Sequence, residues 1–119
     1  MKTILILVIA FFAITAHTEE KSEQELLELR ICQMSGALAY KAYMEGTYDA
    51  QNPDFEKLRY LVDYWGDMMV VKHDRKVAQK AVIYIAKRMQ MTDMRQPWSG
   101  AAYEAMGEFV LMKCVQKAF

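Results

Sequence analysis

The side chains of this chain that could do chemistry are few. His73 is the single histidine outside the apolar N-terminal segment, and it stands next to Asp74. Two pairs of carboxylates lie four residues apart: Asp63 with Asp67, and Glu104 with Glu108. Paired carboxylates can act as general acid and general base, but at this spacing they are typical of the solvated face of an amphipathic helix. A lone histidine beside an aspartate is typical of a helix end, so we predict that the protein is not an enzyme.

The remaining reactive groups are two cysteines, Cys32 and Cys114. A structural zinc site is built mainly from several cysteine and histidine ligands, which this chain cannot supply once its cysteines pair with each other. The sequence also lacks a G-x-S-x-G turn, a glycine-rich phosphate loop and a calcium-binding loop. We therefore expect no catalytic residue, no metal site and no cofactor.

The N-terminus has the layout of a secretory signal peptide. One cation, Lys2, precedes an apolar run over residues 4–16, as signal peptides require, and this run is short for a membrane span of about 20 residues. Small residues near position 18 favour cleavage before Glu19, with cleavage after Ala16 as the alternative. We predict a signal peptide over 1–18 and one domain over 19–119; a buried N-terminal helix and an uncleaved membrane tether are the other interpretations.

Export decides the state of the cysteines. In an oxidising compartment, an even number of cysteines predicts a disulfide, whereas in the cytosol both would be buried thiols. We predict an exported protein, periplasmic or secreted, with a bond between Cys32 and Cys114. The chain has 15 basic and 15 acidic residues, and loss of Lys2 with the leader leaves one acid in excess. Binding to nucleic acid through charge is therefore not expected.

The hydrophobic periodicity predicts an all-α fold, a four-helix antiparallel bundle. The expected helices cover residues 22–45, 52–73, 74–89 and a last segment that starts at Pro97 or Ser99 and ends near Lys117. Ser22 with Glu25 forms a capping box, and Asn52 before Pro53 is the expected second cap. Asp74 caps the third helix, and one long helix through residues 73–74 is the alternative. Most methionines are expected as flexible core fillers.

Antiparallel first and last helices would place the two cysteines at the same height in the bundle. The predicted fold and the predicted disulfide therefore agree, although neither was used to derive the other.

Apolar residues on two opposite faces set the first helix apart. Such a helix is either central in its domain or shared with a partner. On the second helix, two tyrosines and a valine project away from the buried stripe. The candidate interaction surface comprises these residues and one face of the first helix: Tyr60, Tyr64, Val71, Leu27, Ile31, Met34 and Leu38.

Two short segments carry a resemblance. Cys32 is followed by Gly-Ala-Leu-Ala at 36–39, and the last helix holds Ala-Tyr-Glu-Ala at 102–105 before Phe109 and Cys114. This pattern resembles small uncharacterised exported helical proteins of bacteria and their phages. The resemblance implies a bacterial or prophage setting in the periplasm, and it assigns no functional residue.

Together, these features predict an exported, non-enzymatic protein that binds another protein or a second copy of itself. A periplasmic inhibitor or an immunity-type protein fits this description. One alternative is a membrane-tethered regulator of lysis or exclusion whose leader stays uncleaved. Another is a carrier of a small apolar ligand, which would need a cavity of about 300 Å³ or more.

Overall fold

The structure, a computed structural model, describes the backbone of residues 2–98 and 100–116 and the side chains of 23–98 and 100–116. Four α-helices and one terminal π-helix follow one another: α1 Lys2–Gly46, α2 Phe55–Met68, α3 Arg75–Gln90, α4 Gly100–Phe109 and η1 Val110–Val115. Over these residues there is no strand. The all-α prediction with four helices is confirmed.

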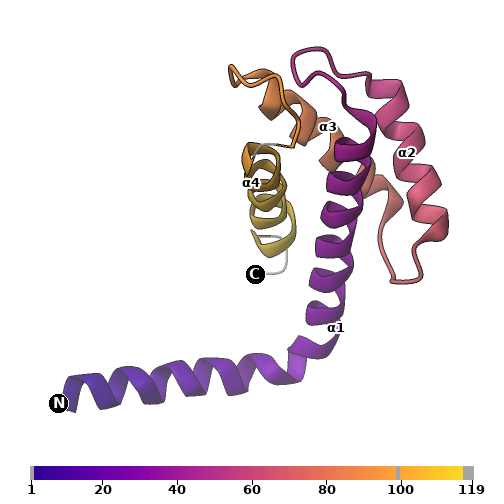
Figure 1. The fold of residues 1–119 in the computed structure, drawn as a ribbon. Helices are drawn as coiled ribbons and strands as arrows, with labels where there is room; N and C mark the ends of the chain where they lie inside the picture. Colours follow the sequence, from indigo (N-terminus) through magenta and orange to yellow (C-terminus); the bar gives the residue numbers. More distant parts are fainter. Residues whose placement is uncertain (1, 99, 117–119) are drawn as a thin grey trace.

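The first helix is longer than predicted, because α1 does not begin at Ser22 but runs without a break from Lys2. Residues 18–28 are mostly strong helix formers with no glycine or proline, so the capping box does not interrupt the helix. Figure 1 shows the first part of α1 leading away from the other helices. The side chains of the predicted signal peptide lie outside the described residues, and that interpretation stays a prediction.

The ends of α2 differ from the prediction at both termini. Asp54, not Asn52, caps α2 by accepting a hydrogen bond from the backbone N–H of Lys57. Asn52 instead donates its side-chain amide to Asp49. The helix ends at Met68, and Met69 is extended, since the two β-branched valines that follow are poor helix formers. The second helix is thus shorter than residues 52–73.

The predicted break before α3 is confirmed, which excludes one long helix through residues 73–74. The Asp74 carboxylate accepts from the N–H groups of Lys76 and Val77. A second contact holds the same point: the Asp74 N–H donates to the hydroxyl of Ser35 at 2.6 Å. Ser35 is fully buried and donates in turn to the carbonyl of Ile31 at 2.7 Å, so one hydroxyl ties α1 to the start of α3.

We expect Ser35→Ala to lower the free energy of unfolding by about 1–3 kcal/mol, because it leaves the Asp74 N–H without an acceptor. Urea unfolding followed by circular dichroism measures this change. Ser35→Thr keeps the hydroxyl and is expected to recover part of the loss. A Ser35→Ala variant as stable as the parent would contradict the expectation.

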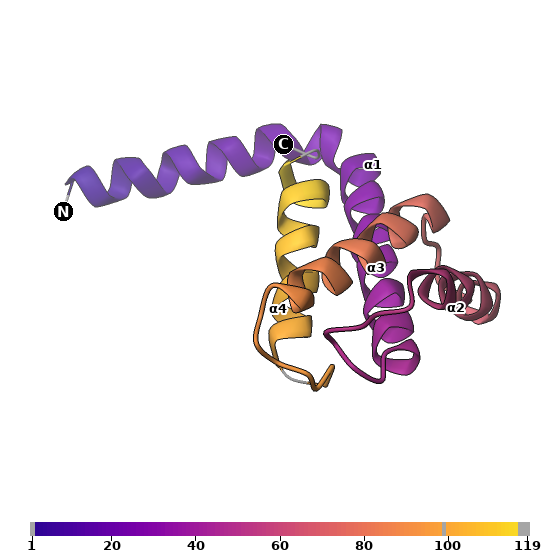
Figure 2. The same cartoon turned by 90° about the horizontal axis from the view of Figure 1, so that it is seen from above.

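The helices alternate in direction, and α1 lies in the middle. Figure 1 shows α1 rising, α2 descending beside it and α4 descending on its other side, while Figure 2 shows α3 crossing α1 obliquely. α1 packs against α2, α3, α4 and η1. This central position explains its two apolar faces, as an irregular bundle would require.

Small side chains, not methionines, dominate the core. The buried alanines come from α1, α3, α4 and one loop: Ala39, Ala42, Ala50, Ala78, Ala81, Ala86, Ala102 and Ala105. Met89 is the one methionine among the fully buried side chains of the described residues. Met44, Met69 and Met106 pack half-buried against the core, whereas Met68, Met91, Met94 and Met112 are exposed. The expectation of a methionine-filled core is therefore met only in part, because helices that cross this closely leave room mainly for alanine and glycine. A Cβ added at Gly36 would lie 2.8 Å from Cγ2 of Val110.

The predicted disulfide is present and joins α1 to η1. The Cα atoms of Cys32 and Cys114 are 5.6 Å apart. Phe109 and Cys114 are both buried, although five residues along an α-helix would place them on different faces. In a π-helix, residue i pairs with residue i+5, so the π-turn returns Cys114 to the face that meets α1.

Two loops at the opposite end of the bundle are joined by one side chain. The side-chain amide of Gln51 donates to the carbonyls of Thr92 and Met94, each at 2.7 Å. The backbone N–H of Ala50 donates to the carbonyl of Arg95 at 2.8 Å. These bonds connect the α1–α2 loop to the α3–α4 loop.

Candidate functional site

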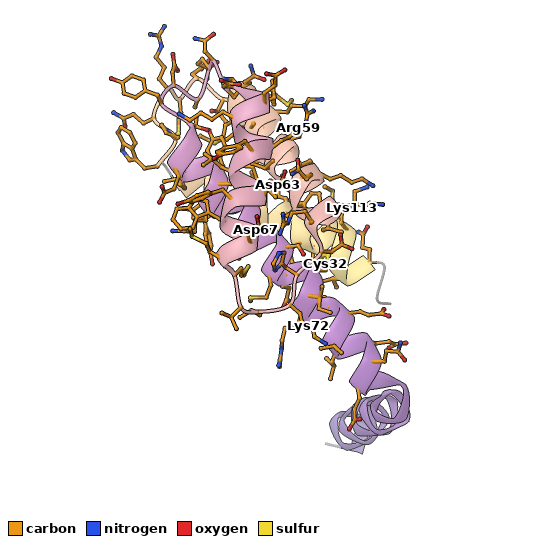
Figure 3. All side chains as sticks on the ribbon, turned by 90° about the vertical axis from the view of Figure 1, so that its right-hand side faces the viewer. Cys32, Arg59, Asp63, Asp67, Lys72 and Lys113 are labelled. Atoms are coloured by element: carbon orange, nitrogen blue, oxygen red, sulfur yellow. A yellow bond between two sulfur atoms is a disulfide. The ribbon has the colours of Figure 1, made fainter. Side chains whose placement is uncertain are left out.

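The paired carboxylates connect helices. Asp63 and Asp67 lie along one face of α2 (Figure 3) and accept hydrogen bonds from Arg75 of α3 at 3.1 and 3.0 Å. The guanidinium lies over Gly66, where a Cβ would come within 2.6 Å of its Nε. Both acids are matched by one cation, so this pair supports packing and not acid–base chemistry.

The two acids of the second pair, Glu104 and Glu108, have different surroundings. Glu108 accepts hydrogen bonds from Arg88 and from the Tyr84 hydroxyl, and these bonds lower the pKa of the Glu108 carboxyl below its ordinary value. Glu104 is exposed. His73 places Nδ1 2.9 Å from the carbonyl of Val71. In residues 23–98 and 100–116, no three metal-ligating side chains gather at one point.

An open groove of about 380 Å³ lies between α1 and α2. Its walls are almost wholly apolar, apart from the charged end of one lysine: Ala37, Leu38, Lys41, Trp65, Met68 and Met69. Lys41 places its ammonium 4.3 Å from the centre of the Trp65 ring, a favourable cation–π contact. We call these six residues the α1–α2 groove.

The residues of the predicted interaction surface differ in how far they are exposed. Tyr60, Tyr64, Val71 and Leu27 are 63%, 41%, 49% and 47% exposed, as expected. Ile31 and Met34 are half-buried.

Leu38 corrects the prediction, because it is only 3% exposed and belongs to the core and the groove floor. α2 covers α1 near Leu38 and does not extend over the part of α1 that lies N-terminal to Leu38. Helical periodicity predicts that Trp65 and Met68 lie on the buried face of α2, but Met68 is 57% exposed and lines the open groove. No pattern in the sequence marked Lys41 as part of this groove.

The line of α1 side chains that helps to form the groove continues past the end of α2. Arg30, Met34, Ala37 and Lys41 follow one another at spacings of four, three and four residues, so they form one line along α1. Ala37 and Lys41 line the groove, whereas Arg30 lies nearer the N-terminus of α1 and is exposed. Because α2 ends at Met68, no described helix covers Arg30 and Met34, the N-terminal half of this line.

A second hollow, of about 610 Å³, lies on another side of α1, between α1, α3 and η1. Its lining mixes apolar and charged residues with both half-cystines: Glu28, Leu29, Ile31, Cys32, Asp74, Val77, Lys80, Phe109, Lys113 and Cys114. Ile31 of the predicted surface belongs to this hollow, which we call the disulfide pocket. Figure 3 shows Cys32 and Lys113 at the junction of α1 and η1.

Two hydroxyls are buried without a partner. Tyr43 Oη, near the end of α1, and Thr47 Oγ1, directly after that helix, form no hydrogen bond with the described residues. Burial, helped by the nearby carboxylate of Asp49, raises the pKa of Tyr43 from 10.0 to about 12.

This shift predicts a loss of stability at high pH. An unfolded tyrosine ionises near pH 10.0, whereas native Tyr43 keeps its proton until about pH 12. The stabilisation is therefore complete below pH 10 and decreases as the pH rises towards 12, by about 2 kcal/mol at most. Urea unfolding at pH 9, 10 and 11 measures it. Tyr43→Phe is the control, since its stability should fall less over this range; equal slopes would contradict the assignment.

The fold and the groove define a disulfide-linked four-helix domain with an open apolar furrow between two helices. Comparisons of the chain with models of protein families, with curated proteins and with solved structures found no match. Within the part of the chain whose side chains are described, no helix has both the length and the apolarity to cross a membrane.

Proposed function

We propose that this protein is an exported, non-enzymatic binding protein whose partner inserts an amphipathic helix along α1, below the end of α2. The observation that carries the proposal is the partly exposed apolar surface of α1 beyond the end of α2. α2 covers the Ala37–Lys41 part of α1, while Leu27 and Met34 lie beyond its end. A helix placed in line with α2 would cover them through the same kind of packing.

The charges around this surface favour a partner with acidic flanks. Arg30 and Lys41 lie on the line described above, and Lys72 follows directly after Val70 and Val71 in the α2–α3 loop. All three cations are exposed. Lys41 already pairs with Glu45 at 3.6 Å, so Arg30 and Lys72 are the cations left for a partner. The nearest acid of α2, Asp67, is already paired with Arg75. Complementary charge of this kind directs association and sets the register of a docked helix.

The proposed periplasmic location rests on features other than this surface. The predicted leader, the disulfide and the resemblance to exported helical proteins of bacteria and phages support a place in the periplasm. In that compartment, an inhibitor or an immunity-type protein would use such a surface to block one partner. The intact mass of the exported protein tests this setting. A mature N-terminus at Glu19 supports export with cleavage, whereas a retained leader would favour a membrane-tethered regulator.

Photo-crosslinking in the producing cell tests the surface itself. A benzophenone amino acid replaces Leu27 or Met68 at the surface, or Lys87 on α3 as a matched exposed control. We expect one adduct of the same mass from both surface positions and none from Lys87, with the crosslinked peptide an acidic amphipathic helix. Its affinity for the mature domain should fall at least about tenfold in Met34→Glu, a cost of about 1.4 kcal/mol.

Three outcomes would overturn the proposal. An adduct of twice the chain mass would identify a second copy as the occupant. A crosslinked segment without an acidic amphipathic pattern would contradict the proposed chemistry. No adduct above the level at Lys87 would mean that the surface has no occupant.

A further inference from the structure

The disulfide pocket has the construction of a small-molecule site, on a different side of α1 from the groove. Its volume of about 610 Å³ falls within the range of about 300–1,000 Å³ that is usual for ligand sites. Three separate elements, α1, α3 and η1, form its walls. The Cys32–Cys114 bond holds two of them together, so the pocket is formed before any ligand binds.

The interior of the pocket is apolar. Leu29 and Ile31 come from α1, Val77 comes from α3, and Phe109 comes from the end of α4. Phe109 is 3% exposed and rests against the ring of Tyr84, with 5.7 Å between ring centres. Such walls favour an aliphatic or aromatic body, which gains about 25 cal/mol for each Å² of apolar surface removed from water.

Four charged groups face the pocket: Glu28 from α1, Asp74 and Lys80 from α3, and Lys113 from η1. The Asp74 carboxylate is occupied by the two N–H groups that it caps. Lys80 and Lys113 make no ion pair with any described residue, and both are exposed at the rim. Two cations therefore stand beside two carboxylates, and that of Asp74 is already held by backbone hydrogen bonds at the start of α3.

We propose that this pocket binds an amphipathic anion, a molecule with an apolar body and one carboxylate or comparable acidic head. The body lies on Leu29, Val77 and Phe109, and the head meets Lys80 and Lys113 at the rim. The partner helix of the proposed function would lie along the other side of α1. Binding in the pocket is thus a separate property that either surface could show without the other.

Octanoate and 1-octanol, which share one chain length and differ in charge, are the probes. Each is titrated into the exported ¹⁵N-labelled protein and followed by the shifts of its backbone amides. Octanoate is expected to give saturable shifts at Leu29, Val77 and Phe109, and to bind about fivefold more tightly than octanol, because two exposed cations contribute a few tenths of a kcal/mol each.

Matched variants separate charge from packing. Lys80→Gln with Lys113→Gln should remove the preference for octanoate over octanol, while Lys87→Gln on the outer face of α3 should leave it intact. Glu28→Gln should strengthen octanoate binding, because it removes one of the two opposing charges. None of these exposed positions contributes to the core, so folding is retained.

Equal affinities for octanoate and octanol would overturn the proposal, as would shifts that do not saturate. Shifts confined to Lys41, Trp65 and Met68 would assign the binding to the α1–α2 groove and would also overturn it. A preference for octanoate that survives in the double lysine variant would contradict the role of the rim cations. None of these results bears on the partner helix, which crosslinking tests separately.

Discussion

Replacing both cysteines, as Cys32→Ser with Cys114→Ser, is expected to lower the free energy of unfolding by about 4.5 kcal/mol. The bond joins residues separated by 82 positions, and closing a loop of that length removes much of the conformational entropy of the unfolded chain. Domains of this size are stable by only about 5–15 kcal/mol. The loss therefore amounts to a large part of the total stability.

Urea unfolding of the mature domain at pH 7, followed by circular dichroism, measures the effect. Wild-type protein held in a reducing agent is the control, and it should unfold at the same urea concentration as the double variant. The bond also fixes η1 against α1, so amide exchange in residues 110–115 should become faster than in α3. A double variant within about 1 kcal/mol of the oxidised wild type would contradict the chain-entropy argument.

Gln51→Glu is expected to have the second largest effect, a loss of about 2–3 kcal/mol at pH 7.5. The amide nitrogen of Gln51 donates to two carbonyl oxygens, those of Thr92 and Met94, at 2.7 Å. A carboxylate has nearly the same shape but offers no donor, so its negative oxygen would face two oxygens. Both hydrogen bonds are lost, and a charge is placed in a half-buried site that favours the neutral form.

Acid should partly restore this variant. The carbonyls disfavour the ionised carboxyl, which raises its pKa above the ordinary glutamate value. A group whose pKa is raised in the folded state stabilises fully below its unfolded pKa, and that contribution is lost as the pH rises. The stability gap between variant and wild type should therefore be smaller at pH 4 than at pH 7.5.

Gln51→Met supplies the matched control, since it keeps the length of the side chain and removes both donors. Its expected loss is about 1–2 kcal/mol, and it should not depend on pH between 4 and 7.5 relative to wild type. Urea unfolding at both pH values gives the two comparisons. A pH-independent loss in Gln51→Glu would show that charge plays no part in the effect.

Local signals were enough to predict several features of the fold. Asp74 caps α3 because its own carboxylate reaches the N–H groups two and three residues along, a contact that depends on neighbouring residues alone. Tyr60 and Tyr64 are exposed because helical periodicity directs them away from the buried face of α2. The disulfide followed from the even number of cysteines in a chain predicted to be exported, and the antiparallel order of the first and last helices agrees with it.

Contacts between residues far apart in the sequence determined the features that local signals did not predict. Nothing near Leu38 distinguishes it from Leu27, yet α2 covers the first and ends before it reaches the second. Asp63 and Asp67 are exposed, as helical periodicity predicts, but only the position of α3 brings Arg75 within hydrogen-bond distance of both. The bonds from Gln51 span about 40 positions of the chain, so no local pattern could indicate them.

The acids and cysteines that could have done chemistry therefore have structural roles in the fold. By itself, the sequence determined the helices, the cap at Asp74 and the pairing of Cys32 with Cys114, because each depends on periodicity, on neighbouring residues or on the number of cysteines. Only the tertiary structure decided that the acids of α2 serve Arg75, that a π-turn aligns Cys114, and that α1 keeps an uncovered face. Those outcomes depend on where each helix ends relative to the others, which no short segment encodes.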